Sequence, residues 1–441
     1  MTLLTIASRG ALRRWPSALR RSLPMLALAL YACSDLTTVE APDVTEPSAL
    51  DNANGALVLR AGALSAFAQG VGQQAFFSGL MADEFADRNA GTFAADRRVV
   101  TQQNDGFYPY LNFSTARIGA LTAIQALQRH NPTPAWRIGE LFALLGYVEI
   151  IFAENLCSGV PLGQVVDGRP AYGPTLSRSE ILRESLAHFD SAALYSTAND
   201  SIANLVRIGR ARALLDSGNF AAAGAAAAGV PPSYRHDVVF GATTLGTNIV
   251  FRNLAQLRLA TVSNVEGVNG LPFVAANDPR VPTQNLGAGQ GGTIHTFLRY
   301  TSLTSPIRLA SGVEAALIRA EAALRAGDIT AWAGLLNTLR QTAITPAMPA
   351  LTADSTTAAS ATLRHNVMFR ERAFWMYLTG HRIGDLRRLV RQYGRAEESV
   401  YPTGAYHKQG LTRGGQAALR VPQPEENNPN YQPAACTQDT P

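Results

Sequence analysis

The chain has 441 residues, of which 46% are hydrophobic and 16% are charged. This is enough for a large core in one or two closely packed lobes. The formal net charge is +5, but five arginines between positions 9 and 21 account for all of it, so the rest of the chain is close to neutral. This distribution argues against a nucleic-acid-binding protein.

The first 32 residues have the layout of an export signal. The five arginines precede a short apolar run, 23–32, and no acidic residue occurs before Asp35. The run is too short to span a bilayer, which takes about 20 residues. It ends in Leu30-Tyr31-Ala32-Cys33, which resembles a bacterial lipobox. We expect residues 1–32 to be a lipoprotein signal peptide and Cys33 to be lipidated; the alternative is an ordinary export signal with a chance cysteine.

Residues 33–49 are rich in Thr, Pro, Asp, Glu and Ser, a composition that cannot bury a core. We predict a flexible tether there and a folded domain over 50–441. Besides Cys33 the chain has two cysteines, Cys157 and Cys436. Export allows a disulfide between them, but the sequence leaves this pairing open.

Apolar residues then recur at helical spacing in eight segments. These segments are 56–69, 116–129, 136–154, 178–196, 202–217, 220–228, 312–326 and 330–343. Turns containing Gly218 and Gly327 separate two of the helix pairs, as in tetratricopeptide hairpins. We predict a mainly α fold, a tetratricopeptide-like helical-repeat scaffold with long irregular loops and a few short strands. The repeat consensus is incomplete, and a plain alanine-rich helical protein is the alternative.

The segment from about 231 to 311 has a different composition, with many Gly, Asn and Pro residues. It contains β-like runs at 248–251 and 297–300, and a glycine-rich stretch, 287–292, that is typical of a flexible loop. Segments 85–111 and 345–362 are also loop-like. Long loops on a rigid scaffold commonly carry binding sites.

The stretch from Phe369 to Leu389 carries the most characteristic pattern, a Glu-Arg-containing helix followed by Gly-x-Arg-x-x-Asp-Leu-x-Arg. It resembles the C-terminal signature of the SusD/RagB family of nutrient-binding lipoproteins. The matching positions, within a signature region 365–441, are Glu371, Arg372, Gly380, Arg382, Asp385, Leu386 and Arg388. We expect Gly380 to form a turn between two helices and Arg382 to pair with Asp385 on the second helix.

Further segments resemble the family in the same order along the chain: Glu314 with 318–322, the Asp-Pro-Arg element at 278–280, and the terminal turns at 421–425 and 428–430. The chain departs from the family pattern at Trp375-Met376 and at Thr379. These departures put the identity of a ligand in doubt more than they do the fold.

The resemblance implies a lipid-anchored outer-membrane protein, facing the cell exterior, that is not an enzyme and needs no cofactor. It implies capture of an oligosaccharide or a peptide and transfer to a SusC-like TonB-dependent transporter. A helical-repeat scaffold for envelope assembly is the main alternative. A periplasmic glycoside hydrolase, which needs two opposed carboxylates, is the other. The sequence has no Cys/His metal spacing, phosphate loop or nucleophile elbow.

A sugar site needs aromatic faces for stacking and polar groups for the hydroxyls. The loop before the 116–129 helix holds both kinds. The predicted ligand-binding residues are Asp83, Glu84, Arg88, Phe93, Asn104, Phe107, Tyr108 and Tyr110. The last three aromatic residues could instead anchor the next helix in the core, and Tyr300 and Trp332 are alternative ligand contacts.

Overall fold

The computed structural model describes residues 47–105, 107–242 and 246–436. The predicted signal peptide, Cys33 and residues 34–46 of the predicted tether lie outside this part of the chain. Asp51–Pro441 is one compact unit, which the following paragraphs describe; η1 (Pro47–Leu50) is a short 3-10 turn. Within the described ranges, no helix is both long enough and apolar enough to cross a membrane.

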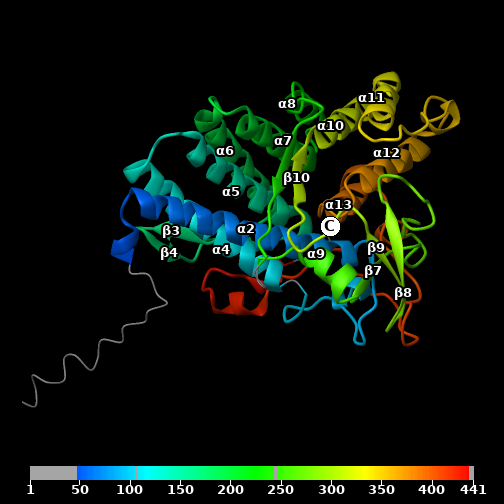
Figure 1. Ribbon diagram of the computed structural model, residues 1–441, viewed down its shortest axis with the longest axis horizontal. Helices are drawn as coiled ribbons and strands as arrows, with labels where there is room; N and C mark the ends of the chain where they lie inside the picture. Colours follow the sequence, from blue (N-terminus) through cyan, green and yellow to red (C-terminus); the bar gives the residue numbers. More distant parts are fainter. Residues whose placement is uncertain (1–46, 106, 243–245, 437–441) are drawn as a thin grey trace, which may run out of the picture. The chain divides into compact units, whose positions relative to one another are not determined.

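Most of the unit is built from helices that pack in consecutive pairs. Four such pairs lie in the described ranges: α2 (Ala53–Met81) with α4 (Phe107–His130), α5 (Trp136–Asn155) with α6 (Arg178–Ser196), α7 (Asp200–Asp216) with α8 (Phe220–Ala226), and α10 (Gly312–Arg325) with α11 (Ile329–Thr342). Each pair also contacts the next one along the chain. Figure 1 shows α6, α7, α8 and α10 following one another across the view. The predicted mainly α, tetratricopeptide-like scaffold is confirmed.

Local sequence explains where several of these helices begin. The side chains of Asn52, Asn199 and Asp328 each accept a hydrogen bond from a backbone N–H in the first turn of α2, α7 and α11. Ser177 and Glu180 form a capping box at the start of α6. These contacts satisfy N–H groups that have no partner within the helix, so each helix starts where its cap stands.

The two predicted interhelical turns are confirmed. Gly218, between α7 and α8, has a φ of +79°, and Gly327, between α10 and α11, has a φ of +80°. Glycine adopts this left-handed backbone without the steric cost that a Cβ imposes. The turns therefore bring each second helix back along the first.

Two further helices, α12 (Ala361–Trp375) and α13 (Arg382–Tyr393), follow the last pair. The helix α12 contacts α10, whereas α13 packs against α2 and α5, so the C-terminal part returns to the first half of the chain. Shorter helical elements are α3 (Ala94–Arg97), α9 (Ile249–Phe251), the π-helical turn η2 (Arg252–Gln256), and the 3-10 turns η3 (Ala353–Ser355), η4 (Glu397–Ser399), η5 (Gln423–Asn427) and η6 (Pro433–Ala435).

The strands are short and pair two by two in antiparallel ladders, five of which lie in the described residues. They are β1 (Phe85–Asp87) with β7 (Ala260–Val262), β2 (Val160–Pro161) with β5 (Thr175–Leu176), β3 (Gln164–Val166) with β4 (Arg169–Ala171), β6 (Arg235–Val238) with β10 (Ile307–Ser311), and β8 (Thr283–Gly289) with β9 (Gly292–Phe297). The strands β6 and β10 hold the segment 235–311 against the helical scaffold, because α7 contacts β10.

The first two long helices extend beyond their predicted ends. The helix α2 continues from residue 69 to Met81 through three glycines, which weaken a helix signal in the sequence. Packing explains the glycine at position 70: an added Cβ at Gly70 would lie 2.7 Å from the ring of Phe113 on α4. The helix α4 begins at Phe107 rather than at residue 116, so the predicted loop 85–111 is helical at its end.

The β-like and loop-like predictions in the middle of the chain were partly wrong. Residues 248–251 are not a strand, because the Asn248 side chain accepts a hydrogen bond from the Phe251 backbone N–H and caps the short helix α9. A run of a few apolar residues fits either structure by pattern alone. Only the first residue of 297–300 is in a strand, and residues 287–292 belong to the β8–β9 hairpin rather than to a flexible loop.

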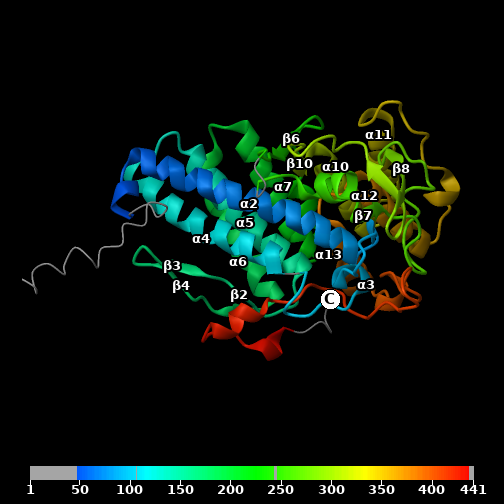
Figure 2. The ribbon, with the colours of Figure 1, turned by 60° about the horizontal axis from the view of Figure 1, so that its bottom comes forward.

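The pairing of the two cysteines, which the sequence left open, is present in the structure. Cys157 and Cys436 form a disulfide with 5.0 Å between their Cα atoms. Figure 2 shows the C-terminal segment, in red, running close to β2, which follows Cys157. The disulfide thus ties the end of the described chain to the end of α5.

Candidate functional site

The predicted signature residues lie on α12, on α13 and in the turn between them. Gly380 in this turn has a φ of +79°, and an added Cβ would lie 2.1 Å from Oε1 of Gln74 on α2. Gln74 Nε2 in turn donates a hydrogen bond to the Gly380 carbonyl oxygen at 2.6 Å. The expected turn between two helices is confirmed, and the close approach to α2 explains why it is a glycine.

The charged signature residues form a buried network. Asp385 accepts hydrogen bonds from Arg372 Nε at 2.9 Å and from Arg388 Nη2 at 2.8 Å, and Arg388 Nη2 also lies 3.1 Å from Oε2 of Glu321 on α10. Burial by itself would raise the pKa of Asp385, but the two guanidiniums outweigh it and hold the pKa well below its usual value. The carboxylate therefore stays charged, and the network joins α10, α12 and α13.

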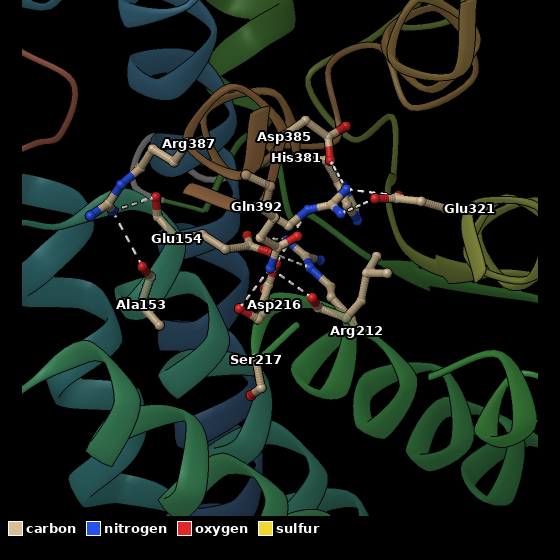
Figure 3. Close-up of polar contacts among 12 residues, drawn as sticks. Ala153, Glu154, Arg212, Asp216, Ser217, Glu321, His381, Asp385, Arg387 and Gln392 are labelled. Carbon is tan, nitrogen blue, oxygen red and sulfur yellow. Dashed lines mark hydrogen bonds and ion pairs between the residues drawn. The ribbon is translucent and has the colours of Figure 1, made fainter. Parts of the chain in front are cut away.

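Other side chains of α13 cap the ends of earlier helices (Figure 3). Arg387 Nη1 donates to carbonyl groups at the C-terminal end of α5, at 2.7 Å for Glu154. Gln392 Nε2 donates to carbonyl groups at the end of α7, at 3.0 Å for Leu215. The last carbonyls of a helix have no partner within it, so these contacts replace water where the helix ends are buried. The signature region is a structural junction.

Glu314, also part of the predicted signature, is fully buried on α10. Its Oε1 lies 3.2 Å from His381 Nε2. Burial lowers the pKa of His381, and the nearby cation of Arg212 lowers it further. The neutral imidazole is therefore favoured, and the pair lies inside the core rather than in a cleft open to a substrate.

The predicted pairing of Arg382 with Asp385 was wrong. Arg382 instead makes a two-pronged ion pair with Asp83, with 2.6 Å between Nε and Oδ1 and 2.8 Å between Nη2 and Oδ2. Spacing along α13 allows the predicted pair, but Asp385 is already bonded to Arg372 and Arg388. Only the packing of α13 against α2 brings the distant carboxylate within reach.

The first two predicted ligand residues are part of this junction. Asp83 and Glu84 are each 1% exposed. The Oε1 atom of Glu84 accepts a hydrogen bond from the Leu378 backbone N–H at 2.9 Å, and the carbonyl oxygen of Glu84 accepts one from the Tyr377 hydroxyl at 2.8 Å. A ligand could touch these carboxyl groups only if the α2–α13 contact opened.

The predicted aromatic ligand residues differ in exposure. Tyr110 is buried, stacks on Phe152 with 5.3 Å between ring centroids, and donates its hydroxyl to the Pro161 carbonyl oxygen at 3.2 Å. Phe93 packs edge-on against aromatic rings of α2. Tyr108 is 58% exposed, and the side chain of Phe107 is not among those that the structure describes.

The two remaining polar residues of the predicted set make local contacts. Arg88 Nη1 donates to the carbonyl oxygen of Asp87 at 3.0 Å, and Asn104 Oδ1 accepts from the Thr101 backbone N–H at 2.9 Å. Of the eight predicted residues, those with described side chains line neither of the two cavities described next.

The larger cavity is a cleft of about 680 Å³, within the range of small-molecule sites. Its walls come from β6, β10, α10, α11, the end of α12 and the segment after β9. We call it the arginine cleft, because five arginines line it: Arg235, Arg280, Arg299, Arg308 and Arg319. No Asp or Glu is among its described lining residues.

Aromatic residues also line the arginine cleft. Tyr234 and Trp375 line the cleft and are half-buried, and the Arg280 guanidinium lies 5.2 Å from the centre of the Trp375 ring. Tyr300, one of the two alternative predictions, lines the cleft but is 8% exposed and donates its hydroxyl to the Leu378 carbonyl oxygen. Trp332, the other alternative, is fully buried against Met368 and lies outside the cleft.

A second, shallower cavity of about 540 Å³ lies beside the disulfide. It is lined by uncharged residues, including the exposed Tyr172 and the side chains of Gln164, Asn430 and Gln432. In the described ranges, no group of three or more His, Cys, Asp or Glu side chains is placed to hold a metal ion.

Sequence reasoning pointed to the loop-rich segment 231–311 as a place for binding but did not select its arginines. Arg280 was noted only as part of the Asp-Pro-Arg element; Arg235, Arg299 and Arg308 also lie in that segment, whereas Arg319 is on α10. They share no motif, because strand pairing and helix packing assemble them from separate parts of the chain. An excess of arginine over acidic residues between 231 and 311 was the only signal available.

Stacked helix pairs that carry a ligand-sized cleft define a helical-repeat protein with a recessed surface site. Residues 300–435 match the model of the SusD family. The fold matches a SusD superfamily protein from Bacteroides thetaiotaomicron VPI-5482 with a TM-score of 0.64 at 15% identity, covering 86% of this chain and 99% of that one. The SusD family match thus covers the C-terminal third of the chain, and the chain as a whole has the fold of the SusD superfamily structures.

Two other solved structures have similar folds. A SusD-like carbohydrate binding protein from Bacteroides vulgatus ATCC 8482 aligns with a TM-score of 0.59 at 13% identity, covering 86% of this chain and 97% of that one. NanU from B. fragilis aligns with a TM-score of 0.61 at 12% identity, covering 88% and 98%. A comparison with curated proteins gives no match.

Proposed function

We propose that the protein is a cell-surface lipoprotein that captures oligosaccharides and passes them to a SusC-like TonB-dependent transporter in the outer membrane. Three features support this proposal: the SusD family match, the lipobox-like sequence that ends at Cys33, and the cleft. One similar fold belongs to a protein described as carbohydrate binding. The lipid anchor, the transporter and the glycan are parts of the proposal.

The observation that carries the proposal is the lining of the arginine cleft. The half-buried Tyr234 and Trp375 line it together with arginines and the hydroxyl-bearing residues Thr338 and Thr342. Aromatic faces pack against the C–H faces of sugar rings, while guanidiniums and hydroxyls bond the sugar oxygens. A cleft with this lining fits a saccharide better than an apolar ligand.

The same lining favours binding over hydrolysis. A glycoside hydrolase needs two carboxyl groups about 5 to 9 Å apart across its cleft, and the described lining has no carboxyl group. The scaffold alternative has less support, because a protein-docking surface needs a contiguous apolar patch rather than a charged recess. We therefore infer a binding protein rather than an enzyme.

The accessible residues among the eight predicted ligand-binding residues remain a second proposed contact surface. Tyr108 is exposed, and Arg88 and Asn104 are half-buried. Replacing Tyr108 by Ala would separate the two surfaces: a loss of glycan binding in this variant would move the site to the loop.

A glycan array probed with residues 34–441 tests the binding role. We expect retention of at least one oligosaccharide class, and Tyr234→Ala should weaken it about tenfold through loss of ring stacking. Tyr195→Ala is the matched control, because Tyr195 is also a half-buried tyrosine with a hydrogen-bonded hydroxyl but lies on α6, outside the cleft. If the array retained no glycan, the proposed function would be wrong.

The anchor and the transporter need separate tests in the native cell. Cys33→Ser should abolish incorporation of labelled palmitate and release the protein from the membrane fraction. Solubilised outer membranes should yield a TonB-dependent barrel together with the wild-type protein. Palmitate labelling that persisted in the Cys33→Ser variant would contradict the predicted anchor.

A further inference from the structure

The arginines that line the cleft carry more positive charge than the carboxylates paired with them can neutralise. Arg280 is fully compensated, because its guanidinium bonds Asp278 and Glu371, each at 2.7 Å. Glu371 also pairs with Arg340, which lies outside the cleft lining. Asp278 and Glu371 thus balance Arg280 and Arg340, so the surroundings of Arg280 are close to neutral.

The charges on β6 and β10 are not balanced. Arg308 on β10 and Asp237 on β6 are cross-strand partners in the ladder, and their side chains form an ion pair. Arg235 shares the same carboxylate at 3.4 Å, and its side chain is 63% exposed. One carboxylate therefore serves two guanidiniums here.

Two more arginines of the cleft have no carboxylate partner in the described part of the chain. Arg299 is exposed and donates one hydrogen bond, from Nη2 to the Pro279 carbonyl oxygen at 3.2 Å. Arg319 is exposed on α10, and no described residue forms an ion pair with it. Counted together with Arg235 and Arg308, four guanidiniums face one carboxylate, an excess of three positive charges.

The neighbouring positive charges also act on Arg299. Its pKa is lowered, first by burial and then by the positive charges of Arg308 and Arg235. Like charges held in one recess raise the energy of the charged state, and an anion placed among them would lower it. Arg299 and Arg319, which have no carboxylate partner among the described residues, are suited to bind such an anion. A guanidinium can bond a planar carboxylate or a sulfate through two N–H groups.

We propose that the arginine cleft binds an acidic oligosaccharide, whose carboxylate or sulfate groups pair with Arg299 and Arg319 while a sugar ring lies against Tyr234 or Trp375. This inference rests on the proposed function and adds the charge of the ligand to it. The half-buried aromatic residues favour a saccharide over an acidic peptide. The cationic lining selects against uncharged glycans, because a neutral ligand would cover the arginines without replacing their water.

Pairs of probes that differ only in charge test the inference. Oligogalacturonate and its full methyl ester differ in the carboxylate, and a sulfated oligogalactan and its desulfated form differ in the sulfate. Poly-glutamate of similar length serves as the acidic peptide. Binding of each probe to residues 34–441 is measured by calorimetry alongside an array of acidic and neutral glycans, from about 0.05 to about 0.5 M salt.

We expect acidic glycans to be preferred and their affinity to fall as salt rises. Arg299→Gln and Arg319→Gln should each weaken binding about tenfold, the loss of one charge-assisted contact. Both variants should keep an unfolding temperature close to that of the wild type, because both arginines are exposed and neither forms an ion pair with a described residue. Arg169→Gln, an exposed arginine on the β3–β4 hairpin outside the cleft, is the matched control and should bind as the wild type does.

The outcomes separate the two proposals. Preference for acidic glycans that Arg299→Gln weakens and Arg169→Gln does not would support the inference. Equal or better binding of the methyl ester and of neutral glycans would overturn it and leave the binding role intact. Binding of poly-glutamate alone would also overturn it, and the absence of any bound glycan would overturn the binding role as well. The relative strength of the carboxylate and sulfate arms identifies the acidic group.

Discussion

Arg382 at the start of α13 pairs through two nitrogen–oxygen contacts with Asp83, which lies 299 positions earlier in the sequence, directly after α2. Both side chains are nearly inaccessible to solvent, at 6% and 2% exposure. A buried ion pair of this kind joins the last helix of the signature region to the first helix of the scaffold. Loss of this ion pair should therefore lower the stability of the fold more than it affects the function.

We predict that Arg382→Ala destabilises the protein by about 3–5 kcal/mol, because it leaves the Asp83 carboxylate buried without a partner. Urea unfolding followed by circular dichroism measures the change. Arg183→Ala is the control: Arg183 lies 3.7 Å from Glu180 on the surface of α6, with side chains 74% and 43% exposed. That variant should cost under about 0.5 kcal/mol. Equal losses in the two variants would show that the buried pair is not a structural tie.

Glu84, next to Asp83, should make stability depend on pH. Burial raises its pKa from 4.5 to about 8, so the folded protein holds a proton that the unfolded chain releases above pH 4.5. The stability that this group contributes is complete below pH 4.5 and is lost as the pH rises through about 8. The slope attributable to this one group approaches about 1.4 kcal/mol per pH unit between those values.

The variant Glu84→Gln isolates this effect, because the amide has the shape of the protonated acid and does not titrate. The free energy of unfolding is measured for both proteins from about pH 5 to pH 8. The wild type should lose stability relative to the variant as the pH rises. Parallel curves would mean that Glu84 does not take up a proton on folding.

Gly380 is predicted to tolerate no side chain. A Cβ there would meet Gln74 Oε1 at 2.1 Å in a backbone with a φ of +79°, so Gly380→Ala should cost about 2–4 kcal/mol. Gly334 is the matched control: it is exposed inside α11 with nothing within 4 Å of an added Cβ. Gly334→Ala should stabilise by about 0.5–1 kcal/mol. Thermal unfolding of the two variants in opposite directions is the expected result.

The disulfide gives the fourth prediction. Cys436→Ser frees the C-terminal segment from the end of α5 and should cost about 2–4 kcal/mol. Cys157→Ser should cost a similar amount, and the double variant should be no less stable than the worse of the two single variants. A reducing agent should lower the melting temperature of the wild type alone. Additive losses would point to packing of the side chains rather than to the bond.

Local physics explains which parts of the fold the sequence predicts well. Helix α6 is predicted at both ends, since its apolar period and its Ser177–Glu180 capping box lie within neighbouring residues. The C-terminal end of α2 is missed, because Gly70 weakens the helix locally and is explained only by the ring of Phe113 from another helix. The signature pattern likewise predicts the α12–α13 turn but assigns the wrong partner to Arg382.

The same distinction between local and tertiary causes applies to the candidate site. The sequence alone determined the repeat scaffold, the turns at Gly218 and Gly327 and a loop-rich segment suited to binding, because each depends on residues close together in the chain. Only the tertiary structure decided that Asp83 and Glu84 are buried and that Arg235, Arg299, Arg308 and Arg319 line one cleft. The arginines come from two strands, a loop and a helix. Their common charge arises from packing, which no local pattern encodes.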